Sequence, residues 1–135
     1  KKLVDFKRID LFLKMNELEI QKILRKFATD RDWEQFHKLK NLAISINIES
    51  SELLEIFQWE NENSDFWNKK KIKNEIEDEV ADIMLYLLRF SDLANINIEK
   101  VCFDKIKKNK KKYPISLSKG KTTKYNKFKI KSKNQ

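Results

Sequence analysis

In 135 residues this chain has one glycine, Gly120, and one proline, Pro114. Folds that contain many strands need such residues at their hairpins and tight turns. Their scarcity disfavours an all-β or a dinucleotide-binding α/β fold. We therefore predict an all-α protein, built from a few helices with short connections.

Apolar residues recur at helical spacing in four segments. Asn16, Asn41 and Asn97 stand where they can cap the first, second and fourth of these helices, and Pro114 ends the last. Short connections between helices are typical of a four-helix bundle. The predicted helices cover roughly residues 17–30, 42–59, 72–93 and 98–113. In the fourth, the apolar positions are expected to face inward: Ile98, Val101, Cys102 and Ile106.

The formal net charge of +9 is unevenly distributed, with acidic residues dense in 49–82 and the basic excess after Asn97. Such an excess suits nucleic acid, an acidic membrane or a polyphosphate, and charge alone does not choose among them. We expect one domain over residues 1–114, with about 15 peripheral residues at its start. Residues 115–135 are expected to form a basic tail that is extended or mobile.

The single cysteine, Cys102, excludes an intramolecular disulfide framework and a Cys-rich zinc site, and it suits a reducing compartment. Its expected place is a small buried position. No apolar run approaches the length of a membrane span, and the basic start of the chain lacks a cleavable signal's small-residue site. We expect an intracellular, cytoplasmic protein with no membrane partner.

Two pairs of carboxylates interrupt the apolar stripes of the second and third predicted helices. Glu49 and Glu52 are three residues apart, as are Glu79 and Asp82, so each pair projects from one helical face. If the two helices pack antiparallel, four carboxylates meet in a partly buried site that requires a cation. Oxygen ligands without nearby His or Cys favour Mg²⁺, with Mn²⁺ as a substitute.

The alternative is that these acids form a solvated helix face, the usual place of glutamate in a lysine-rich chain. Glu55 and Glu75 lie near the same faces, and for them a solvated or supporting role is favoured. A basic helical nucleic-acid binder would also explain the lysines, but it leaves the acid pairs unexplained, so nucleic acid is not the expected partner. A catalytically dead scaffold would not need all four acids.

The acids and the residues around them resemble a known family. Glu49 to Glu52, followed by Glu79 to Asp82, is similar to the ExxE and ExxD metal motif of the all-α nucleotide pyrophosphohydrolases, the MazG and dimeric dUTPase group. The resemblance to its dCTP pyrophosphatase branch covers roughly residues 16–128. It is carried by residues 27–37, Lys40-Asn41-Leu42, Phe57-Gln58-Trp59 and residues 109–114.

The resemblance implies a homodimer or homotetramer that uses Mg²⁺ to cleave a deoxynucleoside triphosphate to the monophosphate and pyrophosphate. The metal and catalytic residues would be Glu49, Glu52, Glu79 and Asp82. Leu24 departs from the pattern, because the mammalian branch has a histidine there near the base pocket. A preference for dCTP or a 5-modified dCTP is the expectation, with a broader NTP or dUTP pyrophosphatase as the alternative.

Several aromatic and basic residues are candidates for contact with the nucleotide. Trp33 and Trp59 offer flat surfaces for a base, and Tyr86 lies one turn beyond Asp82; the alternative for each aromatic is a core position. His37 is more often a packed loop residue, and ligand contact is the minority interpretation. In the fourth helix one face could hold polyphosphate oxygens: Lys105, Asn109, Lys112 and Tyr113.

Overall fold

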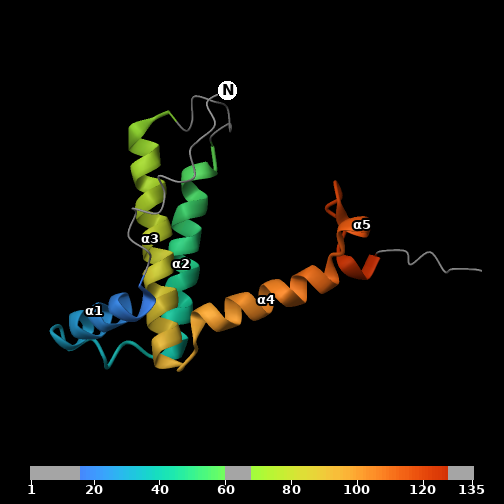
Figure 1. The fold of residues 1–135 in the computed structure, drawn as a ribbon. Coiled ribbons are helices and arrows are strands. Elements are labelled where there is room, and N and C mark those ends of the chain that lie inside the picture. Colours follow the sequence, from blue (N-terminus) through green and yellow to red (C-terminus); the bar gives the residue numbers. More distant parts are fainter. Residues whose placement is uncertain (1–15, 60–67, 128–135) are drawn as a thin grey trace, which may run out of the picture. The chain divides into compact units, whose positions relative to one another are not determined.

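The computed structural model describes residues 16–59 and 68–127, and every regular element in those ranges is helical (Figure 1). The all-α prediction is therefore confirmed for the described part of the chain. None of the helices found there has the length and apolar content of a membrane span. The helices are α1 (Glu17–Thr29), α2 (Leu39–Phe57), α3 (Lys70–Leu93), α4 (Ile98–Lys112) and α5 (Ile115–Ser118), followed by a 3₁₀ turn, η2 (Tyr125–Lys127).

Two of the three predicted helix caps are confirmed. The side-chain oxygen of Asn16 accepts a hydrogen bond from the Glu19 amide at 3.2 Å, and that of Asn97 accepts from the Lys100 amide at 2.8 Å. Each bond satisfies an amide of the first helical turn that has no partner within its own helix.

The predicted cap at Asn41 is wrong. The N-cap of α2 is Lys38, so Asn41 lies inside the helix. Its side-chain amide donates to the Phe36 carbonyl at 2.8 Å. Backbone bonds from Phe36 and His37 to the Trp33 carbonyl fold the preceding loop into turns. Asn41 therefore stabilises that loop instead of starting the helix.

The chain divides into two compact units, residues 1–95 and 96–135. In the first unit α3 packs against α2 and against α1. Figure 1 shows α2 and α3 side by side and running in opposite directions. This is the antiparallel pairing that the two acid pairs required.

The packed core of the first unit is small. Ala28, Leu42 and Leu88 are its fully buried apolar residues among those described. Gln21 of α1 is also buried, and its amide donates to the Leu88 carbonyl of α3 at 3.3 Å. Burial of such a polar group is tolerated because it is hydrogen-bonded. This bond fixes α1 on the half of α3 that follows the acid pair.

The second unit contains α4, α5 and η2, and none of the residues of α4 is buried. Val101 is 43% exposed and Ile106 is 49% exposed, so these positions, which were expected to face inward, are not buried. Cys102, which was expected to be buried, is exposed. Helical periodicity identified the apolar face correctly but could not show what covers it.

Among the described residues after 114, two short segments are folded where an extended or mobile tail was expected, and residues 121–124 have no regular structure. Residues 115–118 form α5, and Tyr125 packs edge-on against Tyr113 with 5.9 Å between ring centroids. Lys112 also lies 4.9 Å from the centre of the Tyr125 ring. These contacts give the basic segment a local structure. The predicted peripheral start, residues 1–15, lies outside the described residues, as do residues 128–135.

Candidate functional site

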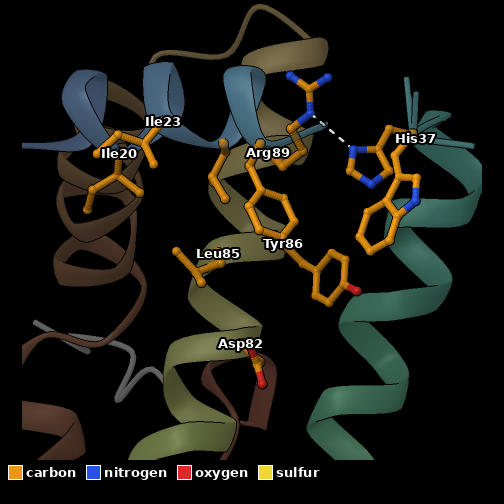
Figure 2. A pocket seen from close by; sticks show the side chains of 10 residues that line it. Ile20, Ile23, His37, Asp82, Leu85, Tyr86 and Arg89 are labelled. Carbon is orange, nitrogen blue, oxygen red and sulfur yellow. Dashed lines mark hydrogen bonds between the residues drawn. The ribbon is translucent and has the colours of Figure 1, made fainter. Parts of the chain in front are cut away.

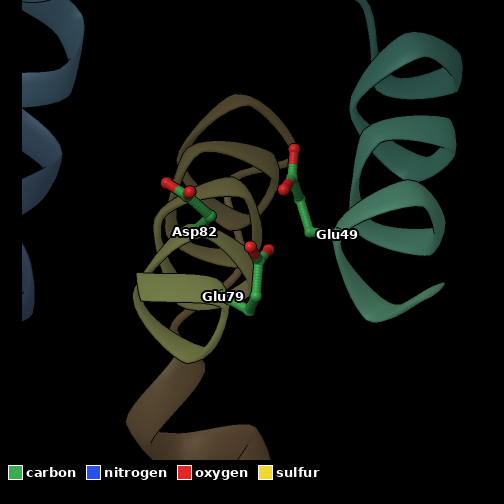
Figure 3. A group of neighbouring side chains, drawn as sticks. All are labelled: Glu49, Glu79 and Asp82. Carbon is green, nitrogen blue, oxygen red and sulfur yellow. The ribbon is translucent and has the colours of Figure 1, made fainter. Parts of the chain in front are cut away.

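Three carboxylates meet between α2 and α3. Glu49 projects from α2, and Glu79 and Asp82 project from successive positions on one face of α3 (Figure 3). One oxygen from each lies within 4.8 Å of the others. Antiparallel packing brings the two helices together, and the three-residue spacing keeps both α3 acids on the same side. The side chains therefore form a cluster of oxygen donors that could hold a cation.

The cluster is electrostatically unfavourable without a cation. Burial raises the pKa of the Glu49 carboxyl, and the negative charges of Glu52, Asp82 and Glu79 raise it further. Burial likewise raises the pKa of Glu79, followed by the charges of Glu52, Asp82 and Asp78. In the described part of the chain, Glu79 Oε2 is the buried side-chain oxygen without a hydrogen-bond partner. An unsatisfied buried oxygen among crowded acids fits a bound cation.

Glu52, the fourth predicted ligand, has a different position. It lies outside the group of three oxygens and is exposed on α2. Its charge nevertheless raises the pKa of both Glu49 and Glu79. Glu55, one turn further along α2, is exposed as well. The structure thus brings together three of the four predicted acids and leaves Glu52 at the edge of the cluster.

A cavity of about 460 Å³ adjoins this cluster (Figure 2). Asp82 belongs to both the acid cluster and the cavity lining. Three predicted substrate-binding residues, Trp33, His37 and Tyr86, line the cavity, and so does Leu24. Most of the remaining lining is apolar and comes from α1 and α3: Ile20, Ile23, Phe27 and Leu85, with Arg89 as a polar addition. Apolar walls with a few polar groups are typical of small-molecule sites.

The loop between α1 and α2 positions the aromatic part of the cavity. The Trp33 amide donates to the Ala28 carbonyl at 2.9 Å, which folds the loop back on the end of α1. Asp32 makes this reversal with a φ of 56°, a conformation that aspartate tolerates better than most residues. The Trp33 ring then meets the rings of Phe27 and His37 edge-on, with centroids 5.8 and 6.2 Å apart.

The other predicted substrate-binding residues are not among those that line this cavity. Trp59 follows α2 and is 87% exposed, and it is not among the lining residues. The remaining four belong to α4 and its C-cap in the second unit: Lys105, Asn109, Lys112 and Tyr113. All four are exposed. These residues stay candidates for contact with the nucleotide.

Sequence reasoning missed Arg89, which lines the cavity and is 5% exposed. It interrupts an apolar run, residues 83–90, near the end of α3. A charged residue in such a run is almost never buried without a partner. The partners here are Asp92, at 2.9 Å, and His37, at 3.4 Å. The interruption itself was the signal that could have identified it.

The sequence of this chain matches the family model described as the MazG-like family over residues 44–128. The chain belongs to the MazG-like family. The matched range includes both MazG-like acid pairs, the cavity-lining part of α3 and all of α4.

Individual relatives extend this result. The chain is 31% identical over 110 residues to dCTP pyrophosphatase 1 of Rattus norvegicus and 32% identical over 110 residues to that of Bos taurus. Each alignment covers 79% of this chain and 64% of the relative, so the chain spans less than two thirds of their length. A solved pyrophosphatase from Archaeoglobus fulgidus is 41% identical, with a TM-score of 0.64, and the match covers 77% of this chain and 98% of that one.

Proposed function

We propose that this MazG-like chain hydrolyses a nucleoside triphosphate, dCTP or a 5-modified dCTP first, to the nucleoside monophosphate and pyrophosphate. The observation that carries the proposal is the position of Asp82, which is shared by the acid cluster and the cavity. A site for a metal-bound polyphosphate thus adjoins a cavity suited to a base. The names of the mammalian relatives and of the archaeal structure support the same chemistry.

Mg²⁺ is the proposed cofactor, with Mn²⁺ as a substitute, and Glu49, Glu52, Glu79 and Asp82 are its proposed ligands and the catalytic acids. Hard dications prefer carboxylate oxygens, and no softer ligand is part of the cluster. When bound, the ion supplies neutralisation of the triphosphate and a lowered pKa for a bound water. The raised pKa values of Glu49 and Glu79 support this assignment because a nearby dication would favour their charged forms.

The protein side chains have separate proposed roles. Glu52 or Glu55 accepts the proton of the attacking water, since both are exposed carboxylates on the acid-bearing helix. Trp33, His37 and Tyr86 contact the base or sugar from the cavity wall. Trp59 is proposed to stack on the base. The α4 group, Lys105, Asn109, Lys112 and Tyr113, is proposed to hold polyphosphate oxygens.

A homodimer or homotetramer is proposed as the working form. Large apolar side chains are exposed on every long helix, and Ile23, Leu54 and Phe103 are each about 60% exposed or more. Monomeric soluble proteins rarely expose large contiguous apolar patches, and such patches mark interaction sites. We expect an interface that buries well over about 1,000 Å². A partner chain would also explain how Trp59, exposed in this chain, reaches a nucleotide.

The extent and location of the catalytic domain belong to the same proposal. We place the domain at residues 1–114 and treat 115–135 as a basic appendage, although the family model continues to residue 128. The proposed compartment is the cytoplasm, where nucleoside triphosphates are available. The lone exposed cysteine suits its reducing conditions.

The direct test is pyrophosphate release from a panel of nucleoside triphosphates, with Mg²⁺ and with a chelator. We expect Mg²⁺-dependent release, fastest for dCTP or 5-methyl-dCTP. Because Leu24 provides no hydrogen bond, we expect weaker base discrimination than in relatives with a histidine. A higher kcat/KM for purine triphosphates would overturn the dCTP preference and favour the broader NTP pyrophosphatase. No release from any triphosphate would overturn the enzyme proposal and favour a non-enzymatic nucleic-acid binder.

A further inference from the structure

Arg89 is held in a fixed orientation at the wall of the cavity. Its side chain is 7% exposed, and its terminal nitrogen pairs with Asp92 at 2.9 Å. Asp92 is itself only 12% exposed and is bound on its other oxygen by Arg25 of α1. A buried carboxylate with two guanidinium partners leaves Arg89 little freedom to turn. The Nε–H group of its guanidinium is not used in this ion pair.

That Nε–H group donates to Nδ1 of His37 at 3.4 Å, the dashed bond in Figure 2. Arginine is always protonated and only donates hydrogen bonds. Nδ1 of His37 is therefore the acceptor and carries no proton. A neutral imidazole has one proton, so it must lie on the other ring nitrogen, Nε2.

The surroundings of His37 keep the ring neutral. Burial lowers the pKa of the imidazole, the positive charge of Arg89 lowers it further, and the charge of Glu34 opposes both. Glu34 does not line the cavity, and Asp82 is the acid among the described residues that do. Figure 2 shows the second ring nitrogen on the side of the ring that faces away from Arg89. Nε2 thus offers a single N–H donor in a cavity whose walls are largely apolar.

We propose that Arg89 is a positioning residue that acts through His37: it fixes the imidazole with its proton on Nε2, so that the cavity presents an N–H donor to an acceptor atom on the edge of a nucleobase. The identity of the ligand in this inference rests on the proposed function. The position of the proton on His37 follows from the structure alone and is independent of the proposed function. Leu24, on the same cavity wall, cannot supply such a donor.

The first experiment reads the proton directly and needs no activity. His37 is the only histidine of the sequence, so nitrogen NMR of its side chain in the full-length, nucleotide-free protein is unambiguous. We expect an unprotonated Nδ1 and a protonated Nε2 at neutral pH. In Arg89→Met we expect the second tautomer to appear and the His37 pKa to rise, because a neighbouring positive charge is gone. Arg25→Met is the matched control, since it also removes a partner of Asp92 but does not touch His37.

A proton on Nδ1 in the wild type would overturn the proposal, even if the protein hydrolyses triphosphates as expected. An unchanged His37 spectrum in Arg89→Met would overturn it as well. If no triphosphate is hydrolysed, the proposed function fails by itself, while the NMR result still decides where the proton lies. The wild-type spectrum keeps the test decisive if Arg89→Met does not fold.

The second experiment is a kinetic cycle with dCTP. His37→Phe removes the donor and is expected to raise KM about threefold to tenfold with kcat nearly unchanged. Arg89→Met is expected to raise KM by a similar or smaller factor, and to add nothing when His37 is already Phe. Lower pH should reduce the defect of Arg89→Met relative to wild type, because an imidazolium carries a proton on both nitrogens. Additive effects of the two substitutions would show that Arg89 does not act through His37.

Discussion

The helices α3 and α4 differ in burial although both carry apolar residues at helical spacing. α3 packs against α1 and α2 and buries Leu88, Arg89 and Ser91, whereas α4 buries no residue within the chain. The acids of α3 have their partner on α2, so one chain assembles them. The basic face of α4 belongs to the second unit. A periodic sequence therefore specifies a face of a helix, but it does not specify what covers that face.

The substitution Asp82→Asn tests whether the acids of α3 form a functional site within one chain. We expect kcat/KM to fall at least about a hundredfold with helical content unchanged, because the variant removes a charge from the metal ligands and the cavity wall together. Glu52→Gln should also abolish turnover if Glu52 is a ligand. The control is Glu77→Gln on the same helix, an exposed acid 3.6 Å from Lys73. Near wild-type pyrophosphate release by Asp82→Asn would refute the metal site.

Deletion of apolar side chains from the two helices should give different kinds of loss. Leu88→Ala removes a side chain that is 1% exposed and should cost about 2–5 kcal/mol in the free energy of unfolding. That cost should be the same at low and high protein concentration. Ile106→Ala removes one that is 49% exposed. In the proposed oligomer a second chain covers α4, so the loss for this variant should grow on dilution.

Urea unfolding at two protein concentrations, together with light scattering, measures both variants. A loss for Ile106→Ala that does not depend on concentration would show that α4 is covered by its own chain. A monomer that remains fully active at micromolar concentration would contradict the proposed assembly altogether.

Trp59→Ala tests whether a residue that is exposed in one chain takes part in the site. We expect KM to rise about tenfold and kcat to change little, because stacking stabilises the ground state and the transition state alike. Phe36→Ala is the control, as Phe36 is also an exposed aromatic residue outside the cavity lining. An unchanged KM for Trp59→Ala would exclude Trp59 from the base site and leave that site to the residues that line the cavity.

The smallest expected effect is a pH dependence of stability in the metal-free protein. The folded-state pKa values of Glu49 and Glu79 lie above their ordinary value of 4.5, so the folded state binds these protons more tightly than the unfolded state. Stability should therefore fall as the pH rises past 4.5 and these groups ionise. Glu79→Gln should raise Tm at neutral pH and lose that advantage near pH 4. Thermal melts in a chelator, repeated with Mg²⁺, measure both effects, and parallel pH curves for the two proteins would contradict the prediction.

The features that sequence reasoning predicted depend on residues close together in the chain. Caps at Asn16 and Asn97 involve partners three residues away, and the acid pairs follow from the same spacing. The prediction that Asn41 caps a helix was wrong because the hydrogen-bond partner of Asn41 belongs to a loop whose turns leave no periodic pattern in the sequence. Arg89 was missed because its contact with His37 joins residues 52 positions apart. The role of Trp59 stays a prediction because its side chain is 87% exposed and does not line the cavity.

The residues of α3 that matter to the site follow one another at intervals of three, four and three: Glu79, Asp82, Tyr86 and Arg89. They put the proposed metal-binding half and the proposed base-binding half of the site on one helix, at fixed angles around its axis. One residue inserted between Asp82 and Tyr86 would leave α3 helical but turn the base-facing half by about 100° and advance it by about 1.5 Å. A substitution can change the residues of either half alone. A change of length between Asp82 and Tyr86 instead changes the position of one half relative to the other.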